Sequence, residues 1–324
     1  MGDLQGSSDS EKLLSLCDRS YKEQCIWFLN AYWDQFASNE AEKLWGYVQK
    51  CAELDLQRKA AGSALDELNA HRFLESIGET LTVLALRDKL RKTGAIGPTE
   101  RPKVVPLTHY LLFRYDGAGV DWRTLVNTKG DNSAEIAEAQ RLLDQVTAAF
   151  VESDRTAALA REAEAAAREQ EAPFKAACEE VEAAVADVQA QEDSYNARTE
   201  ELKRKSTEGG VVQQNKAKAE LAQHLAEDPL PLRKAKITLE AAKKKADKAR
   251  APFEAATKAA EEARAVAEEA LEQTRRRVEE AEEYLREVKA KPGTPHGAIW
   301  WLERELEEQK AYLPASKGGV IKRK

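Results

Sequence analysis

The residues most able to do chemistry are basic side chains concentrated late in the sequence. Between Arg233 and Arg250, eight lysines and arginines stand against only Glu240 and Asp247, although the whole chain carries a formal net charge of −7. Such an excess can form an electrostatic contact with a polyanionic surface, whether an acidic protein filament, a layer of acidic lipids or a nucleic acid. It can also be a solvated helix face that pairs with carboxylates of a neighbouring helix. The sequence leaves both interpretations open.

Two of these polyanionic partners fit the sequence poorly. No aromatic residue lies between the lysines, so nucleic-acid bases would have nothing to stack on. The basic face has few large apolar residues, which disfavours a lipid surface. No apolar run approaches the ~18–20 residues that a membrane span needs. We therefore predict no nucleic-acid partner and no membrane span.

Catalytic signatures are missing from the sequence. It contains no glycine-rich phosphate loop after a strand, no GxSxG and no HExxH. The four cysteines form no CxxC pair, which argues against a zinc site or a disulfide framework. The first ten residues are polar and acidic, unlike a signal peptide. We predict a soluble, cytoplasmic protein that is not an enzyme.

A loop between two helices has the outline of a calcium-binding EF-hand. With His109 in the last position, the calcium ligands would be Pro98, Glu100, Pro102, Val104, Pro106 and His109. Calcium requires several oxygen ligands, a bidentate glutamate last and a glycine at the sharp turn. Only Glu100 qualifies, and Lys103 stands at the glycine position, although Val105 fits the apolar eighth position. We predict a degenerate loop from Pro98 to His109 that binds no calcium, and no cofactor elsewhere.

The elements that position these features are predicted to be helices. Apolar residues at helical spacing predict five helices in a compact head, which requires no strand beyond a short bridge at Val104–Val105. The predicted helices are Tyr21–Phe36, Ala41–Leu54, Leu65–Ile77, Glu79–Leu90 and Leu107–Tyr115.

A heptad pattern after Asn132 predicts a coiled coil. Its first arm carries Ile136, Ala139, Leu143, Val146 and Phe150, then Phe174, Cys178, Val181, Val185 and Val188, with Tyr195 and Leu202 continuing the pattern. The second arm ends with Leu271, Thr274, Val278, Ala281, Leu285 and Val288.

The two arms are predicted to fold back on each other. Gly209–Gly210 is a natural reversal point, and both arms carry Ala-Pro-Phe, at 172–174 and 251–253, which the reversal would bring level. Pro173 should kink or interrupt the first arm.

The predicted fold class is therefore all-α, with four segments. Residues 1–10 are expected to be disordered, 11–126 to form an EF-hand-like helical domain, and 127–291 to form an antiparallel helical hairpin. A short helix, Ala298–Tyr312, and a basic tail, Lys317–Lys324, complete the segment 292–324.

Several segments, in order along the chain, resemble one known family. They include Cys-Ile-Trp-Phe-Leu-Asn-Ala-Tyr-Trp at 25–33, His-Tyr-Leu-Leu-Phe-Arg-Tyr at 109–115 and Gly-Ala-Ile-Trp-Trp-Leu-Glu-Arg-Glu-Leu-Glu-Glu at 297–308. Shorter matches are Leu-Ala-Gln at 221–223, Pro-Leu at 231–232 and Glu-Ala-Ala at 240–242. Together they are similar to the calcium-regulated F-actin-bundling protein family of amoeboid protists.

The resemblance implies a cytoskeletal protein that binds and cross-links actin filaments through its hairpin. It also implies that the C-terminal helix, with Ile299, Trp300 and Trp301, folds back on the hairpin as a restraint. The candidate actin-binding residues are Lys203, Arg204, Lys205, Lys216, Lys218, Arg233, Lys234, Lys236, Lys243, Lys244, Lys245, Lys248 and Arg250.

Two departures from the family pattern affect this expectation. The lost calcium ligands imply that calcium no longer regulates the protein, and the longer hairpin leaves the spacing and number of filament contacts open. The alternative function is a coiled-coil scaffold that self-associates without binding actin. Binding to acidic lipids is a third hypothesis.

Overall fold

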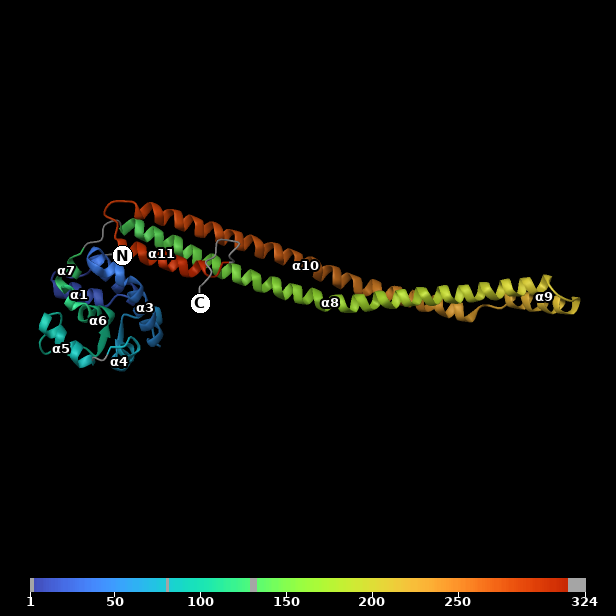
Figure 1. The fold of residues 1–324 in the computed structure, drawn as a ribbon, viewed down its shortest axis with the longest axis horizontal. Helices are drawn as coiled ribbons and strands as arrows, with labels where there is room; N and C mark the ends of the chain where they lie inside the picture. The colour runs from blue at the N-terminus through green and yellow to red at the C-terminus, as the bar shows by residue number, and fades with distance from the viewer. Residues whose placement is uncertain (1–2, 80–81, 129–132, 314–324) are drawn as a thin grey trace. The chain divides into compact units, whose positions relative to one another are not determined.

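The computed structural model describes residues 3–79, 82–128 and 133–313 (Figure 1). The chain divides into two compact units: unit 1 comprises residues 1–150 and 272–324, and unit 2 comprises residues 151–271. The predicted all-α class is confirmed, with one small pair of strands added. The predicted basic tail lies outside the described residues.

Unit 1 begins with a head of seven described α-helices. They are α1 (Asp9–Cys17), α2 (Tyr21–Tyr32), α3 (Ser38–Leu54), α4 (Glu67–Ser76), α5 (Val83–Thr93), α6 (Leu107–Arg114) and α7 (Trp122–Asn127). Side-chain caps fix several starts, because a hydroxyl or carboxylate can accept an otherwise unpaired N–H of the first turn. Ser8 and Ser20 form capping boxes with Glu11 and Glu23. Asp66, Thr82 and Asp121 cap α4, α5 and α7.

The prediction of five helices in the head missed α1 and α7, and most of the predicted bounds differ from those observed by one to four residues. The two largest differences are at the end of α2 and the start of α5. The helix expected over Tyr21–Phe36 ends at Tyr32, where a π-helical turn, Trp33–Ala37, leads into α3. The helix expected from Glu79 begins instead at Val83, because the Thr82 hydroxyl accepts the Ala85 N–H and sets the first turn there.

A short antiparallel strand pair, which the helical pattern did not require, joins two halves of the head. β1 (Ala64–Asp66) pairs with β2 (Val104–Pro106), and Leu65 lies opposite Val105. β-branched Val104 and Val105 favour an extended backbone. The pairing couples α3–β1–α4 to α5–β2–α6, two helix–loop–helix halves linked through their loops.

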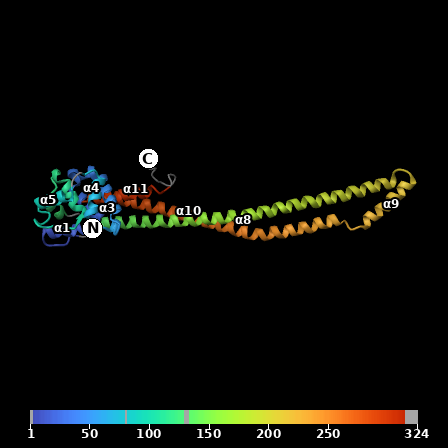
Figure 2. The same ribbon diagram turned by 90° about the horizontal axis from the view of Figure 1, so that it is seen from below.

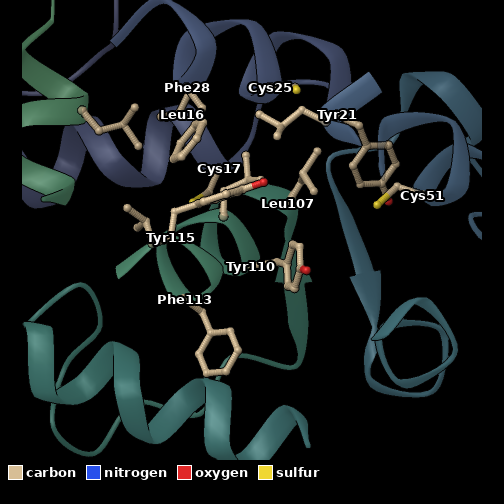
Figure 3. Packing of buried hydrophobic residues seen from close by; sticks show 14 of the residues in the cluster. Leu16, Cys17, Tyr21, Cys25, Phe28, Cys51, Leu107, Tyr110, Phe113 and Tyr115 are labelled. Carbon is tan, nitrogen blue, oxygen red and sulfur yellow. The ribbon is translucent and has the colours of Figure 1, made fainter. Parts of the chain in front are cut away.

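The core of the head is built from aromatic and aliphatic residues of α1, α2, α3 and α6. In Figure 3, Phe28 of α2 lies beside Leu16 of α1, Tyr21 lies at a different place along α2, and Tyr110 of α6 lies below them. Each of these four side chains is at most 2% exposed. Burial of large side chains supplies most of the stabilisation, at about 25 cal/mol per Å² of apolar surface.

Buried Gln24 ties three segments of the head together. Its Nε2 donates to the carbonyl oxygens of Arg19 and Ser63, each at 2.7 Å, and its Oε1 accepts from the Thr108 N–H at 2.8 Å and hydroxyl at 2.9 Å. A buried amide is tolerated only when its polar atoms are bonded. Gln24 therefore holds α1, β1 and α6 in register, a role that its polar type concealed in the sequence.

The remaining helices are α8 (Ser133–Thr207), α9 (Val211–Ala226), α10 (Leu230–Lys289) and α11 (His296–Lys310). The first turns of α8 and the last turns of α10 belong to unit 1. The seam predicted there is confirmed by burial: Ala139, Leu143, Val146, Thr274, Val278, Ala281, Leu285 and Val288 are all at most 4% exposed. α11 replaces the helix predicted over Ala298–Tyr312.

Unit 2 is an antiparallel pair of arms, seen in Figures 1 and 2 as α8 beside α10. The predicted reversal is confirmed: α8 ends at Thr207, Gly209 has φ +100°, and α9 begins at Val211. A backbone with positive φ favours glycine. Phe174 and Phe253 stack with ring centroids 5.0 Å apart and planes 10° apart, so the two Ala-Pro-Phe segments are level.

The interruption predicted at Pro173 is absent, because α8 continues through it, as α10 does through Pro252. Each proline lacks one N–H and so removes one hydrogen bond from its helix. The bonds of the flanking turns and the Phe174–Phe253 stack hold the arms on either side.

The predicted seam of the first arm was wrong at Val185, which is 49% exposed. Cys178 is partly buried, as are Phe174, Val181 and Val188. Ala177 and Ala184, at 1% and 6% exposure, are more deeply buried. The spacing between seam positions alternates between three and four residues through Phe174, Ala177, Val181, Ala184 and Val188. This register buries an alanine at a position where the next residue in the sequence is larger.

Candidate functional site

All thirteen candidate basic residues lie in unit 2, and every one is exposed. Lys203, Arg204 and Lys205 close α8, Lys216 and Lys218 lie on α9, and the other eight lie on α10. The structure thus places the candidate residues of α10 on one helix between its start and Pro252. They form a charged surface, and Lys245 also borders a groove between the arms.

Seven of the thirteen are held by carboxylates. Five pair within their own arm or the loop before it: Lys203 with Glu200 at 2.7 Å, Lys205 with Glu201 at 2.6 Å, Lys216 with Glu220 at 3.9 Å, Arg233 with Asp228 at 3.1 Å and Arg250 with Glu254 at 2.6 Å. Two pair across the arms: Lys236 with Glu192 at 3.1 Å, and Lys245 with Glu180. Exposed pairs of this kind contribute only ~0–1 kcal/mol each.

The other six have no carboxylate partner among the residues that the structure describes. They are Arg204, Lys218, Lys234, Lys243, Lys244 and Lys248. The register explains Lys243: one heptad beyond the Lys236–Glu192 pair, it comes level with Val185, an apolar residue. Intramolecular pairing therefore leaves a substantial positive charge available on α10.

The second candidate feature, α11, lies in unit 1 and packs against the head. Trp301 is 1% exposed, and its ring lies 4.7 Å from that of Trp45. Trp300 is partly buried and Ile299 is buried. Gly297 is required by the contact, because a Cβ there would lie 2.5 Å from Leu29 Cβ.

Polar contacts tie α11 to both the head and the base of the hairpin within unit 1. On the head side, Glu305 pairs with Lys22 at 2.7 Å and Arg304 with Glu42 at 3.0 Å. On the hairpin side, Glu303 pairs with Lys289 at 2.8 Å, and Lys310 pairs with Glu282. α11 therefore bridges two segments that are distant in sequence.

In the degenerate loop from Pro98 to His109, the side chains of Glu100 and His109 are engaged within the protein itself. The Glu100 carboxylate accepts the Gly97 N–H at 2.9 Å. His109, at the position of the last ligand, is 6% exposed and belongs to buried helix α6. Leu65 opposite Val105 matches the apolar eighth position expected of that loop. Among the described residues, no three histidine, cysteine or acidic side chains form a group able to hold a metal.

Burial gives His109 a measurable effect on stability. Removal from water lowers the pKa of His109 from 6.5 to about 4, partly opposed by the charge of Glu100. The unfolded chain therefore binds the extra proton first as pH falls below 6.5, and stability is lost between there and about 4. We expect a loss of about 2 kcal/mol in unfolding free energy from this group between pH 7 and pH 5.

Urea denaturation at pH 7 and pH 5 measures this loss. The His109→Gln variant, which cannot titrate, should show a smaller difference between the two pH values than the parent protein. Equal differences would show that His109 is not the titrating group.

One polar contact in unit 2, made by His224, was not predicted from the sequence. The His224 ring lies 4.5 Å from the Tyr195 ring, and its Nε2 is 3.0 Å from Thr199 Oγ1. Because the Thr199 hydroxyl donates to the Tyr195 carbonyl, it accepts from His224. The pair of seam positions Tyr195 and Thr199 was the available signal, and the contact holds α9 to α8.

Comparison with known proteins assigns the helical arms. The sequence profile of the family described as F actin bundling C terminal matches residues 131–290. Among solved structures, the 34 kDa F-actin bundling protein from Dictyostelium discoideum matches at 19% sequence identity and a TM-score of 0.46, covering 98% of this chain and 100% of that one. No curated protein gives a significant match. None of the described helices is long and apolar enough to cross a membrane. Through residues 131–290, which include α8, α9 and α10, the chain belongs to the F-actin-bundling C-terminal domain family.

Proposed function

We propose that this chain is a non-enzymatic, cytoskeletal protein that binds actin filaments and cross-links them. The family match over residues 131–290 is the observation that carries the proposal. The exposed basic residues of α10 lie inside that range and are the proposed contact. An actin filament is acidic, so lysines without internal partners would gain a favourable contact there.

The proposal assigns different roles to the hairpin and to the head. The hairpin, residues 127–291, carries the filament contact, and the EF-hand-like domain, residues 11–126, is the head from which α11 reaches the hairpin base. The contacts of α11 to Lys22 and Lys289 are suited to restraining the two segments. The number of filament sites in one chain is set by how many exposed basic clusters act independently.

Filament co-sedimentation tests the function directly. The full chain, mixed with filaments at low salt, should enter the high-speed pellet if it binds and the low-speed pellet if it also bundles. Recovery in the supernatant at both speeds would refute actin binding and favour the scaffold function instead. A filament-free control at each speed separates binding from self-aggregation.

Calcium should have no effect on this activity. Sensor sites of ~10⁻⁷–10⁻⁵ M depend on several oxygen ligands acting together, and positions 98, 102, 104 and 106 of the loop are proline or valine. We expect no saturable heat at micromolar calcium in isothermal titration, and identical pellets with calcium or with a chelator. A saturable micromolar site would contradict this expectation.

A further inference from the structure

The two arms of unit 2 carry opposite charge over stretches of equal length. Residues 169–197 of α8 contain eight carboxylates and one lysine, a formal charge of −7. Residues 230–258 of α10 contain nine basic residues and three acidic ones, a formal charge of +6. The Phe174–Phe253 stack places the two stretches level. Each arm could therefore neutralise the other.

The arms neutralise each other very little. Among the described residues of these stretches, only the Lys236–Glu192 and Lys245–Glu180 pairs cross between them. Among the same described residues, five carboxylates of the acidic arm have no cationic partner: Glu169, Glu179, Glu182, Asp187 and Asp193. The four unpaired lysines of α10 likewise have no acidic partner there. The alanine-rich seam holds the helices together, so most of the charge points outward. Unit 2 thus presents an acidic arm beside a basic arm.

One side of this pair of arms has a groove suited to another helical surface. The groove has a volume of about 440 Å³, and Ala183 and Ala184 of α8 and Ala241 and Ala242 of α10 line it. Glu180 and Asp187 border it on the acidic arm. Lys245 borders it on the basic arm. Lys248 follows at i+3 on the same side. Small side chains let a second helical pair approach closely.

We propose that this groove is a self-association surface, on which unit 2 of a second copy of the chain packs. The α8 stretch of each copy lies on the α10 stretch of the other, so both acidic–basic contacts form at once. A surface that is acidic on one side and basic on the other is self-complementary about a two-fold axis. The proposal stands whether or not the chain binds actin.

The charges also select the direction of the two copies. If the two-fold axis runs parallel to the arms, each acidic stretch faces a basic stretch along its whole length, and both hairpin turns lie at the same end. A two-fold axis across the arms would place acidic on acidic and basic on basic, which is repulsive. The copies therefore run in the same direction. Because the contacts are exposed at their edges, salt should weaken them.

Complementary charge reversal in the full chain tests the surface without filaments. The first variant is E180K/D187K, which makes the groove basic on both sides, and the second is K245E/K248E, which makes it acidic on both sides. Sedimentation velocity at low salt should show dimers of the parent protein. Each variant alone should show a dimer dissociation constant raised roughly tenfold or more. An equimolar mixture of the two variants should restore dimers, because each then meets its opposite.

Matched controls carry the same charge changes on the opposite side of the arms. E182K/E192K and K236E/K243E should dimerise like the parent protein. Circular dichroism of every variant checks that helicity is retained. A parent protein that stays monomeric at all concentrations, or a mixture that fails to restore dimers, would overturn the proposal.

A second measurement tests the direction. Pyrene attached to E208C, in a chain that also carries C178S, reports on the hairpin turns because Glu208 is exposed beside Gly209, and the other three cysteines are buried. Dimers running in the same direction should give excimer fluorescence that disappears at high salt. Dimers without excimer fluorescence would contradict the proposed arrangement.

Discussion

Replacing Lys243, Lys244 and Arg250 together by glutamate should remove most filament co-sedimentation at low salt. None of these three residues lines the alanine groove, and two of them have no carboxylate partner among the described residues. The change reverses three positive charges at the proposed contact, so the formal net charge there falls by six. The filament should feel this strongly, because attraction between exposed charges extends over a Debye length of ~8–10 Å at physiological salt. The fraction pelleted across a salt series is the measurement.

The fold itself should tolerate this variant. Among the residues that the structure describes, the only ion pair it removes is Arg250 with Glu254, an exposed contact worth ~0–1 kcal/mol. New like-charge neighbours on the helix add a few tenths of a kcal/mol each. The matched control K175E/K258E/R264E makes the same change in net charge elsewhere on unit 2 and should pellet like the parent protein. If both variants pellet equally, the contact lies outside this cluster.

Trp301→Ala should lower the unfolding free energy of the protein by about 3–5 kcal/mol. The side chain is 1% exposed and packs on Trp45, so its removal leaves a large cavity between α11 and the head. It also removes the indole N–H that donates a hydrogen bond to the Glu305 carboxylate at 3.0 Å. Urea denaturation followed by circular dichroism at 222 nm measures the loss.

The neighbouring tryptophan provides the control. Trp300 is only partly buried, so Trp300→Ala should cost clearly less than Trp301→Ala. Similar losses for both variants would show that α11 is held by its polar contacts to Lys22 and Lys289. In co-sedimentation, release of α11 by Trp301→Ala should increase filament binding if α11 restrains the hairpin, and leave it unchanged if α11 only completes the core.

Periodic features were predictable from the sequence because they depend on spacing alone. The seam from Thr274 to Val288, the reversal at Gly209 and the level Ala-Pro-Phe segments all follow from counting residues. Where two heptad registers were possible, the prediction from the sequence placed the wrong residue in the seam. Val185 is larger than Ala184, yet the register set by Phe174 and Val188 buries the alanine.

Features that depend on distant partners were not predictable. The pairing of β1 with β2 unites residues 40 positions apart, and no local pattern marks residues 64–66 as a strand. The buried role of Gln24 requires carbonyl oxygens supplied by the loops after α1 and before β1. For the candidate site, the sequence located the basic residues. It could not show which of them are left without carboxylates, because that depends on the register between the arms.

The alanine seam of unit 2 implies a gradient of local stability along α10. Between residues 242 and 270 its inward positions are alanines apart from Phe253, whereas Val278, Leu285 and Val288 fill them in unit 1. Each buried methylene that is missing forgoes about 0.8 kcal/mol. Transient opening therefore requires less free energy in unit 2 than at the base of the hairpin. Amide hydrogen exchange should be fastest near Gly209 and become progressively slower toward Val288. The basic surface therefore lies on the part of the coiled coil that opens most often.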